Sequence, residues 1–359
     1  MAQNQVSASS QASTEQSVQG AIIQVDQSAR LPASAERAGR EMLEANAGGF
    51  AVVAGQGDRV ESMVRFGDIQ PETQYPIASA SKWLTAAVVM TVVEEKGLSL
   101  DTPISTWLPK ITGERGQLTL RQLLSQTPGL AGSKGEFYDL NQDHRMTLAD
   151  SALEVASRPL ISKPGEVFAY GGPGFQIAGA VAEAATGKRW AQLFDEKIAK
   201  PLGMTHTYWI HLRLDTEKQL PVSETLNPVL QGGVVSTASD YTRFLSMIAQ
   251  GGVFEGKRLL SNESVDAMLR DQTPTATMTP TGANVLADAH YSLGSWCESW
   301  DSSGACVRNS SIGLFGVYPW VERESKRFGL IFIYQRQDAF RLWPQMEIIR
   351  DSLVGSSAQ

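Results

Sequence analysis

The chain has 359 residues, of which 42% are hydrophobic and 19% are charged, a composition typical of a folded globular protein rather than a disordered one. Its formal net charge of -7 argues against a nucleic-acid partner, because contact with a phosphate backbone needs a concentrated positive surface. No apolar run reaches the roughly 20 residues of a membrane-spanning helix. The four histidines and two cysteines are too few for a dense metal site, so we expect neither metal nor cofactor.

Residues 1–29 are predicted to form a disordered polar tail, because they are rich in Gln and Ser and contain no aromatic residue. They also contain no apolar stretch of the kind found in signal peptides. Two interpretations stay open. Either this segment follows a signal peptide that has been removed, or it is an N-terminal extension of a cytosolic protein.

The segment after the tail is predicted to form a helix, two strands and a second, longer helix. Residues 33–47 carry apolar side chains at helical spacing, and residues 50–54 and 60–66 are strand-like runs separated by a turn. Residues 79–96 are almost wholly apolar and are followed by Gly97. A helix that is apolar on all sides is expected to be buried inside the molecule.

The middle of the chain is predicted to be helical, and strands return near the C-terminus. The expected helices span residues 120–124, 148–156, 174–185, 190–198, 239–249 and 342–354, and the expected strands span residues 291–296, 316–321 and 328–334. Strands at both ends with helices between them predict an α/β fold of the α+β type, with one sheet built from both ends of the chain. The predicted domains are a discontinuous α/β domain, residues 30–100 and 283–355, and a helical domain, residues 101–282.

Ser79 and Lys82 are the first candidates for chemistry. Residues at positions i and i+3 of a helix share a face, so the Ser79 hydroxyl and the Lys82 amine are able to meet at the start of the long apolar helix. A lysine partly removed from water there has a lowered pKa, which suits a base that activates a serine. The structural alternative makes Ser79 a helix N-cap and Lys82 a surface residue.

Cys297 and Cys306 flank a polar segment that contains a glycine, a pattern typical of a hairpin that brings its two arms together. We expect a disulfide between them, and therefore an oxidising compartment. The alternative is two buried thiols that pack as small apolar side chains.

Five segments, in collinear order, resemble the serine β-lactamase and penicillin-binding-protein superfamily, and most of all its class C-like branch with the family VIII carboxylesterases. They are Tyr75–Trp83 (YPIASASKW), Leu120–Leu130 (LRQLLSQTPGL), Lys163–Gly179 (KPGEVFAYGGPGFQIAG), Pro201–Thr205 (PLGMT) and Gly232–Asp240 (GGVVSTASD). The resemblance extends over about residues 32–354. It implies a β-lactamase-like fold, an antiparallel sheet flanked by helices with a helical insertion, and hydrolysis through a covalent acyl-enzyme.

The resemblance implies a role for each matching residue. Ser79 matches the nucleophile and Lys82 its basic partner, and Tyr170 matches the tyrosine that relays protons between nucleophile and leaving group. The third motif falls at Ser311–Gly313, in a register uncertain to within one residue. The backbone N–H groups of Ser79 and Leu314 would then form the oxyanion hole.

Two positions depart from the family pattern. Gly172 stands where the family has an asparagine, and Ser311 stands where it has a lysine or histidine that binds the substrate carboxylate. A serine cannot form a charge-assisted hydrogen bond with a carboxylate. With Gly313 and Phe315, these two residues are the predicted substrate-binding residues, and the departures favour an uncharged ester substrate.

The sequence thus predicts a serine hydrolase, periplasmic or secreted, that acts on small neutral esters as a carboxylesterase. The partner would be a small-molecule substrate, and the oligomeric state is left undetermined. Two alternatives stay open. One is a D-stereospecific amidase or peptidase, or a weak β-lactamase. The other is a non-catalytic binding protein that keeps the fold without turnover.

Overall fold

The computed structural model describes residues 30–45, 47–132, 146–211, 220–221, 226–279, 286 and 288–354. The predicted polar tail, residues 1–29, lies outside the described residues. Among the described helices, none is long and apolar enough to cross a membrane.

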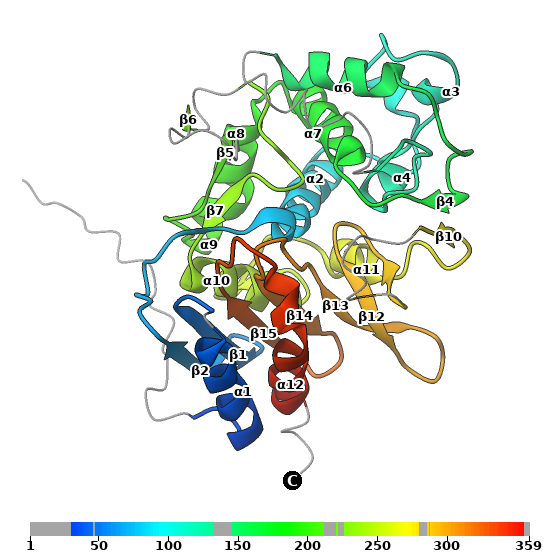
Figure 1. Cartoon of the computed structure of the whole chain (residues 1–359). Helices are drawn as coiled ribbons and strands as arrows, with labels where there is room; N and C mark the ends of the chain where they lie inside the picture. The colour runs from blue at the N-terminus through cyan, green and yellow to red at the C-terminus, as the bar shows by residue number, and fades with distance from the viewer. Residues whose placement is uncertain are drawn as a thin grey trace, which may run out of the picture.

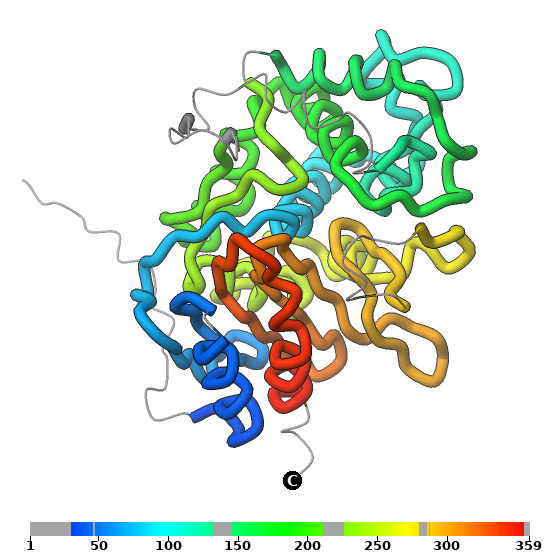
Figure 2. Tube along the Cα trace, viewed as in Figure 1, coloured from blue at the N-terminus to red at the C-terminus, as the bar shows by residue number. Residues whose placement is uncertain are grey.

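The centre of the fold is a seven-stranded sheet in the order β11-β12-β13-β14-β15-β1-β2, and each neighbouring pair in it is antiparallel. Its strands are β1 (Phe50–Gln56), β2 (Arg59–Phe66), β11 (His290–Tyr291), β12 (Trp296–Trp300), β13 (Cys306–Ser310), β14 (Tyr318–Glu322) and β15 (Arg327–Phe332). Because β1 pairs with β15, the two ends of the chain share one sheet. Figure 2 shows the N-terminal and C-terminal segments lying together, with the green middle of the chain beside them.

Successive residues of a strand point to opposite sides of the sheet, and in this sheet the side chains on both faces belong to buried cores. Val52 and its partner Ile331 belong to the core beneath α1 (Ala33–Glu44) and α12 (Trp343–Val354). Val53 and its partner Leu330 belong to the second core, on the other face. Figure 1 shows α1 and α12 side by side over the first face, where the hydroxyl oxygens of Ser34 and Ser352 lie 2.6 Å apart.

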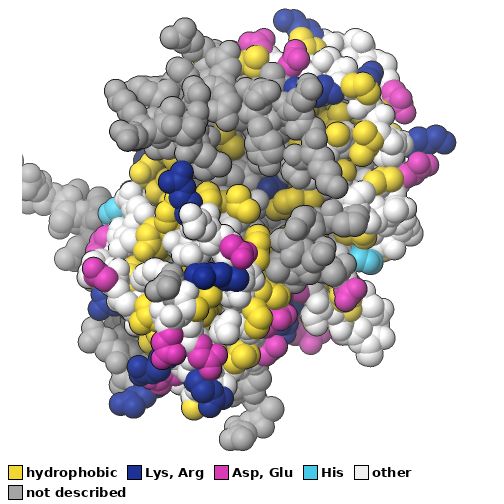
Figure 3. All heavy atoms as spheres, viewed as in Figure 1, with side chains coloured by type: hydrophobic (Ala, Val, Ile, Leu, Met, Phe, Trp, Pro, Cys, Tyr) yellow, Lys and Arg dark blue, Asp and Glu magenta, His cyan; other side chains and the backbone are white. Residues whose placement is uncertain are grey.

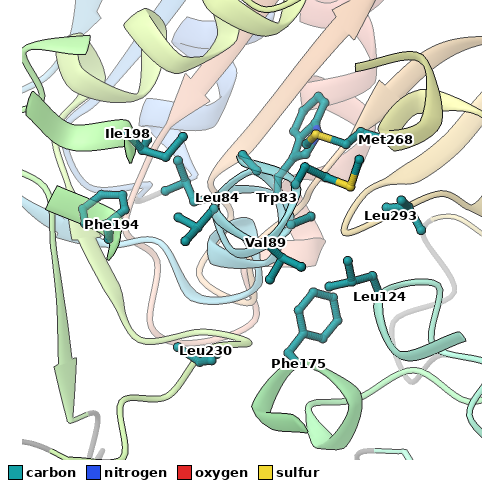
Figure 4. Packing of buried hydrophobic residues seen from close by; sticks show 14 of the residues in the cluster. Trp83, Leu84, Val89, Leu124, Phe175, Phe194, Ile198, Leu230, Met268 and Leu293 are labelled. Atoms are coloured by element: carbon teal, nitrogen blue, oxygen red, sulfur yellow. The ribbon is translucent and has the colours of Figure 1, made fainter. Parts of the chain in front are cut away.

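The helix α2 (Ser81–Lys96) lies at the centre of the second core. Every residue from Ser81 to Val93 is buried, as expected for a helix that is apolar on all sides. Figure 4 shows Trp83, Leu84 and Val89 of this helix surrounded by apolar side chains from several other elements. The helix ends at Gly97, whose φ of 60° is the left-handed conformation that glycine adopts without steric cost.

Most of the other helices that the structure describes belong to the middle of the chain, and η5 near the C-terminus packs with α12 on the first face (Figure 1). They are η1 (Ala78–Ala80), η2 (Ile104–Thr106), α3 (Gly113–Gly116), α4 (Leu120–Leu124), α6 (Leu148–Ser157), α7 (Pro173–Thr186), α8 (Trp190–Phe194), η3 (Asp195–Ala199), α9 (Lys200–Leu202), α10 (Ala238–Ala249), α11 (Asn262–Leu269) and η5 (Ala339–Leu342). Short strands complete the fold: β3 (Tyr75–Pro76), β4 (Val167–Phe168), β5 (Tyr208–His211), β6 (Leu220–Pro221), β7 (Val234–Ser236), β8 (Val253–Phe254), β9 (Lys257–Arg258) and β10 (Thr277–Met278).

This architecture confirms the predicted α+β class and the antiparallel sheet built from both ends of the chain. The boundaries between an α/β domain and a helical domain stay a prediction.

On the face shown in Figure 3, the described Lys and Arg side chains are interspersed with Asp and Glu.

One predicted strand is wrong. Residues 291–296 do not form a continuous strand, because β11 ends at Tyr291 and β12 begins at Trp296. Between them a tight turn is closed by the Ser292 N–H, which donates to the Ser295 carbonyl at 2.8 Å, and Gly294 has a φ of 80°. The chain approaches α2 closely here, since a Cβ on Gly294 would lie 2.6 Å from the Lys82 carbonyl oxygen.

The predicted disulfide joins Cys297 of β12 to Cys306 of β13, with the two Cα atoms 5.8 Å apart. It closes the hairpin next to Trp296, the first residue of β12. The bond therefore joins two neighbouring strands near the β11 edge of the sheet.

Replacing both cysteines, as Cys297→Ser with Cys306→Ser, is expected to lower the free energy of unfolding. Because the closed loop is short, the chain-entropy model gives about 2–3 kcal/mol. Urea unfolding of the variant and the native protein measures the difference. Two freely alkylated thiols in protein from its native compartment would contradict the bond itself.

Candidate active site

Ser79 lies on a short 3-10 turn, Ala78–Ala80, directly before α2 rather than on the α-helix itself. Ser81, the first residue of α2, braces this turn. Its hydroxyl donates to the Ala78 carbonyl at 2.6 Å and accepts the Val234 N–H at 3.1 Å. These bonds hold the serine turn against β7.

Lys82 is the partner of Ser79. Its Nζ donates to the Ser79 Oγ at 3.0 Å and to the Gln231 carbonyl at 2.9 Å. The side chain is 2% exposed, and burial lowers the pKa of the Lys82 amine to about 7. At neutral pH a large fraction of this amine is therefore uncharged, which is the state that accepts a proton.

Tyr170 lies beside this pair. The Lys82 Nζ is 4.7 Å from the centroid of the Tyr170 ring. The Tyr170 ring also contacts two aromatic residues. It stacks on Trp296, with 5.1 Å between the ring centroids and an interplanar angle of 19°, and it meets Tyr291 edge-on, with 6.1 Å between the centroids. The structure thus brings together the three predicted catalytic residues, Ser79, Lys82 and Tyr170.

Ser311 lies next to the nucleophile, and its hydroxyl contacts the backbone there. Its hydroxyl oxygen lies 3.2 Å from the Ser79 carbonyl oxygen and 3.4 Å from the Gly294 carbonyl oxygen, so its single hydrogen is shared between these two acceptors, and the residue is 3% exposed. A buried hydroxyl whose hydrogen is directed to backbone carbonyls braces the Ser79 turn. That Ser311 also contacts the substrate stays a prediction.

Gly313 packs directly on the strand that leads to Ser79. A Cβ at this position would lie 2.3 Å from the Ile77 carbonyl oxygen, so no larger residue fits without movement. The Gly313 N–H donates to the Val317 carbonyl at 2.8 Å. The next residue, Leu314, has a 57% exposed side chain, and its N–H stays the predicted second donor of the oxyanion hole.

The other two predicted substrate-binding residues are buried. Gly172 is the N-cap of α7, and its carbonyl accepts the Phe175 N–H at 3.0 Å. Phe315 is 4% exposed and packs edge-on against Tyr334 at 5.1 Å. For Phe315 this contact indicates a packing role, because the ring is covered by the protein.

Sequence reasoning missed three residues at this site: Gln231, Trp296 and Gln126. Gln231 contributes its backbone carbonyl, and a backbone acceptor leaves no signature in the side-chain sequence. The Trp296 ring stacks on Tyr170, a contact between segments that are distant in the sequence. Gln126 lies inside the LRQLLSQTPGL segment, but its hydrogen bond with Gly171 joins distant segments and is seen only in the folded structure.

The chain matches a family model described as Beta-lactamase over residues 33–343. The chain belongs to the beta-lactamase family. A solved structure from Bacteroides dorei, provisionally named a beta-lactamase, is 31% identical, covers 92% of this chain and 100% of its own, and superposes with a TM-score of 0.78. These matches confirm the β-lactamase-like fold and the resemblance to the superfamily.

Esterases are among the family members that resemble this chain. Esterase EstB from Burkholderia gladioli is 32% identical over 151 residues, which is 38% of this chain and 38% of the relative. A solved family VIII carboxylesterase shares the fold, with a TM-score of 0.69, 17% identity and coverage of 89% of this chain and 96% of its own. The match to curated Mycobacterium tuberculosis relatives spans 61% of their length, at 27% identity over 57% of this chain.

The lowered pKa of Lys82 predicts the pH profile of the site. If the neutral amine is the base, kcat/KM for an uncharged ester rises about tenfold per pH unit below the pKa and levels off above about pH 7. Initial rates with p-nitrophenyl butyrate, measured across buffers of constant ionic strength, give the profile.

Two variants control this measurement. Lys82→Arg should abolish the plateau, because a guanidinium stays protonated throughout this range. Lys200→Arg changes an exposed lysine and should leave the profile unchanged. A native profile that is flat from about pH 5.5 to 8.5 would contradict a titrating Lys82.

Proposed function

We propose that this protein is a carboxylesterase that hydrolyses small neutral esters through an acyl-enzyme on Ser79. The observation that carries the proposal is the hydrogen bond between the Ser79 hydroxyl and a buried Lys82 amine whose pKa is about 7. This arrangement combines a nucleophile with a base that is able to take its proton at neutral pH.

Acylation begins when the Ser79 Oγ attacks the ester carbonyl and its proton passes to the Lys82 Nζ. The carbonyl oxygen becomes negatively charged and is stabilised by the N–H groups of Ser79 and Leu314. The tetrahedral intermediate then expels the alcohol, which leaves with a proton delivered from Lys82 through the Tyr170 hydroxyl. The products of this half-reaction are the acyl-Ser79 ester and the free alcohol.

Deacylation repeats the same steps with water as the nucleophile. Water loses a proton to the Tyr170–Lys82 pair as it attacks the acyl carbonyl, and the Ser79 oxygen leaves with that proton. The carboxylic acid departs and the enzyme returns to its starting state. The chain's own residues carry every proton transfer in this scheme.

The third motif supports an uncharged ester as the substrate class. The Ser311 hydroxyl is directed to the backbone carbonyls of Ser79 and Gly294, so it offers no cation to a substrate carboxylate. The nearby Arg308 is paired with Glu322 and with Asp351, whose carboxylate lies 3.8 Å away. Neither Ser311 nor Arg308 therefore offers a free cation to an entering carboxylate, which would lose water without gaining a charged partner from these two described residues, and this disfavours penicillins.

The first alternative is a D-stereospecific amidase or peptidase, or a weak β-lactamase, because these activities use the same acylating residues. The esterase relatives in the family favour the ester over the amide. The second alternative is a binding protein without turnover. Burying the Lys82 amine costs free energy, and an apolar side chain at this position would avoid that cost. The buried lysine therefore argues against a protein without turnover.

Export to the periplasm or the cell exterior is part of this proposal. The bond between Cys297 and Cys306 supports it, because disulfides persist mainly in oxidising compartments.

A matched pair of substrates tests the ester class. We expect kcat/KM for p-nitrophenyl butyrate to exceed that for p-nitrophenyl hemisuccinate by about tenfold or more, because the two acyl chains are alike except for the carboxylate. Ser79→Ala should abolish the hydrolysis of both esters, and Ser303→Ala, at the exposed end of the β12–β13 hairpin, should leave it unchanged.

The same assay with nitrocefin extends the test to lactams. We expect slower turnover than with the neutral ester. A preference for the hemisuccinate or for nitrocefin would overturn the neutral-ester proposal, and undiminished hydrolysis by Ser79→Ala would overturn the nucleophile.

A further inference from the structure

Gln126 has a backbone conformation that its side chain does not favour. It follows α4 and the C-cap Ser125, and its φ of 60° lies in the left-handed region. At this place after a helix, glycine is the residue that adopts such a φ without steric cost. A glutamine that accepts this strain indicates that its side chain is needed there.

The side chain and the backbone of Gln126 both bind the segment that carries Tyr170. The Ala169 N–H donates to the Gln126 carbonyl at 3.0 Å, and the Gly171 N–H donates to the Gln126 Oε1 at 2.5 Å. The residue is 3% exposed, so these bonds are shielded from water. One glutamine therefore fixes the amides on both sides of Tyr170.

The Tyr170 backbone is also confined by Gly132. A Cβ on Gly132 would lie 2.2 Å from the Tyr170 carbonyl oxygen, so this contact requires glycine. The Tyr170 ring, in turn, stacks on Trp296. The backbone of the tyrosine is thus fixed by Gln126 and Gly132, and its ring by an aromatic neighbour.

We propose that Gln126 is a positioning residue that holds Tyr170 in register with the Ser79–Lys82 pair. The inference rests on the proposed function, since it assigns Gln126 a part in the same acyl transfer. The Lys82 Nζ lies 4.7 Å from the Tyr170 ring centroid, so a small rotation of segment 169–171 changes where the phenol hydroxyl points. Displacements of about 1 Å at a reacting group cost on the order of 100-fold in rate.

The decisive variants are Gln126→Met and Gln126→Asn. Methionine has a similar length but offers only a weakly accepting sulfur in place of the amide oxygen, and asparagine tolerates a positive φ but is one methylene shorter. We expect each to lower kcat for p-nitrophenyl butyrate about tenfold or more, with KM changed by about twofold at most, because proton transfer is impaired and substrate binding is not. Lys326→Asn is the matched control, since Lys326 is an exposed residue with a φ of 55°.

A double-mutant cycle separates positioning from a merely structural role. In a Tyr170→Phe background, Gln126→Met should cause no further loss, because the hydroxyl that it positions is already gone. The readout is the rate at which a fluorophosphonate labels Ser79, followed by intact mass, which remains measurable in slow variants. Thermal melting of each variant reports whether it folds.

Gly132→Ala tests the same idea through the contact with the Tyr170 carbonyl. It takes the place of the Gln126 variants if neither of those variants folds. It should lower kcat and likewise have no added effect in Tyr170→Phe. Native kcat in folded Gln126→Met, Gln126→Asn or Gly132→Ala would overturn the inference, as would losses that multiply with Tyr170→Phe. If the native protein itself is not labelled at Ser79, the proposed function has failed instead, so the two failures are distinguishable.

Discussion

The burial of the Lys82 amine is the constraint on which the rest of the site depends. Removal from water disfavours the ammonium form and lowers the pKa of Lys82 to about 7. The unfolded chain keeps this proton up to about pH 10.4. Between about pH 7 and pH 10.4 folding therefore releases the proton, and the stability of the folded protein falls as the pH decreases toward 7. The protein thus retains a destabilising group whose neutral form is the base that the proposed reaction needs.

The fold supplies this environment through a single helix. The helix α2 is buried from Ser81 to Val93, so a lysine one residue from its start has apolar neighbours that exclude water. The Gln231 carbonyl and the Ser79 hydroxyl give the amine two polar partners without adding a negative charge that would raise its pKa again. The sheet side contributes Ser311, which braces the Ser79 turn.

Local patterns made several features predictable. The apolar run after Ser79 predicts a buried helix with Lys82 on the serine's face, and the polar loop between Cys297 and Cys306 predicts a hairpin; both depend on neighbours in sequence. Other features depend on contacts between distant segments and were not predictable. The hydroxyl of Ser311 meets the Ser79 carbonyl across 232 positions, and Gln126 meets Gly171 across 45. The turn before Trp296 was missed because its glycine is required by contact with α2.

The pKa of Lys82, measured directly, tests the central claim. Protein labelled with 13C at the lysine ε-carbon gives one signal per lysine, and the signal absent from the spectrum of Lys82→Arg identifies this residue. The account predicts that the signal titrates with a pKa of about 7 in the folded protein. A midpoint near 10.4, the value of a lysine in water, would contradict it, because the amine would then be protonated whenever Ser79 has to lose its proton.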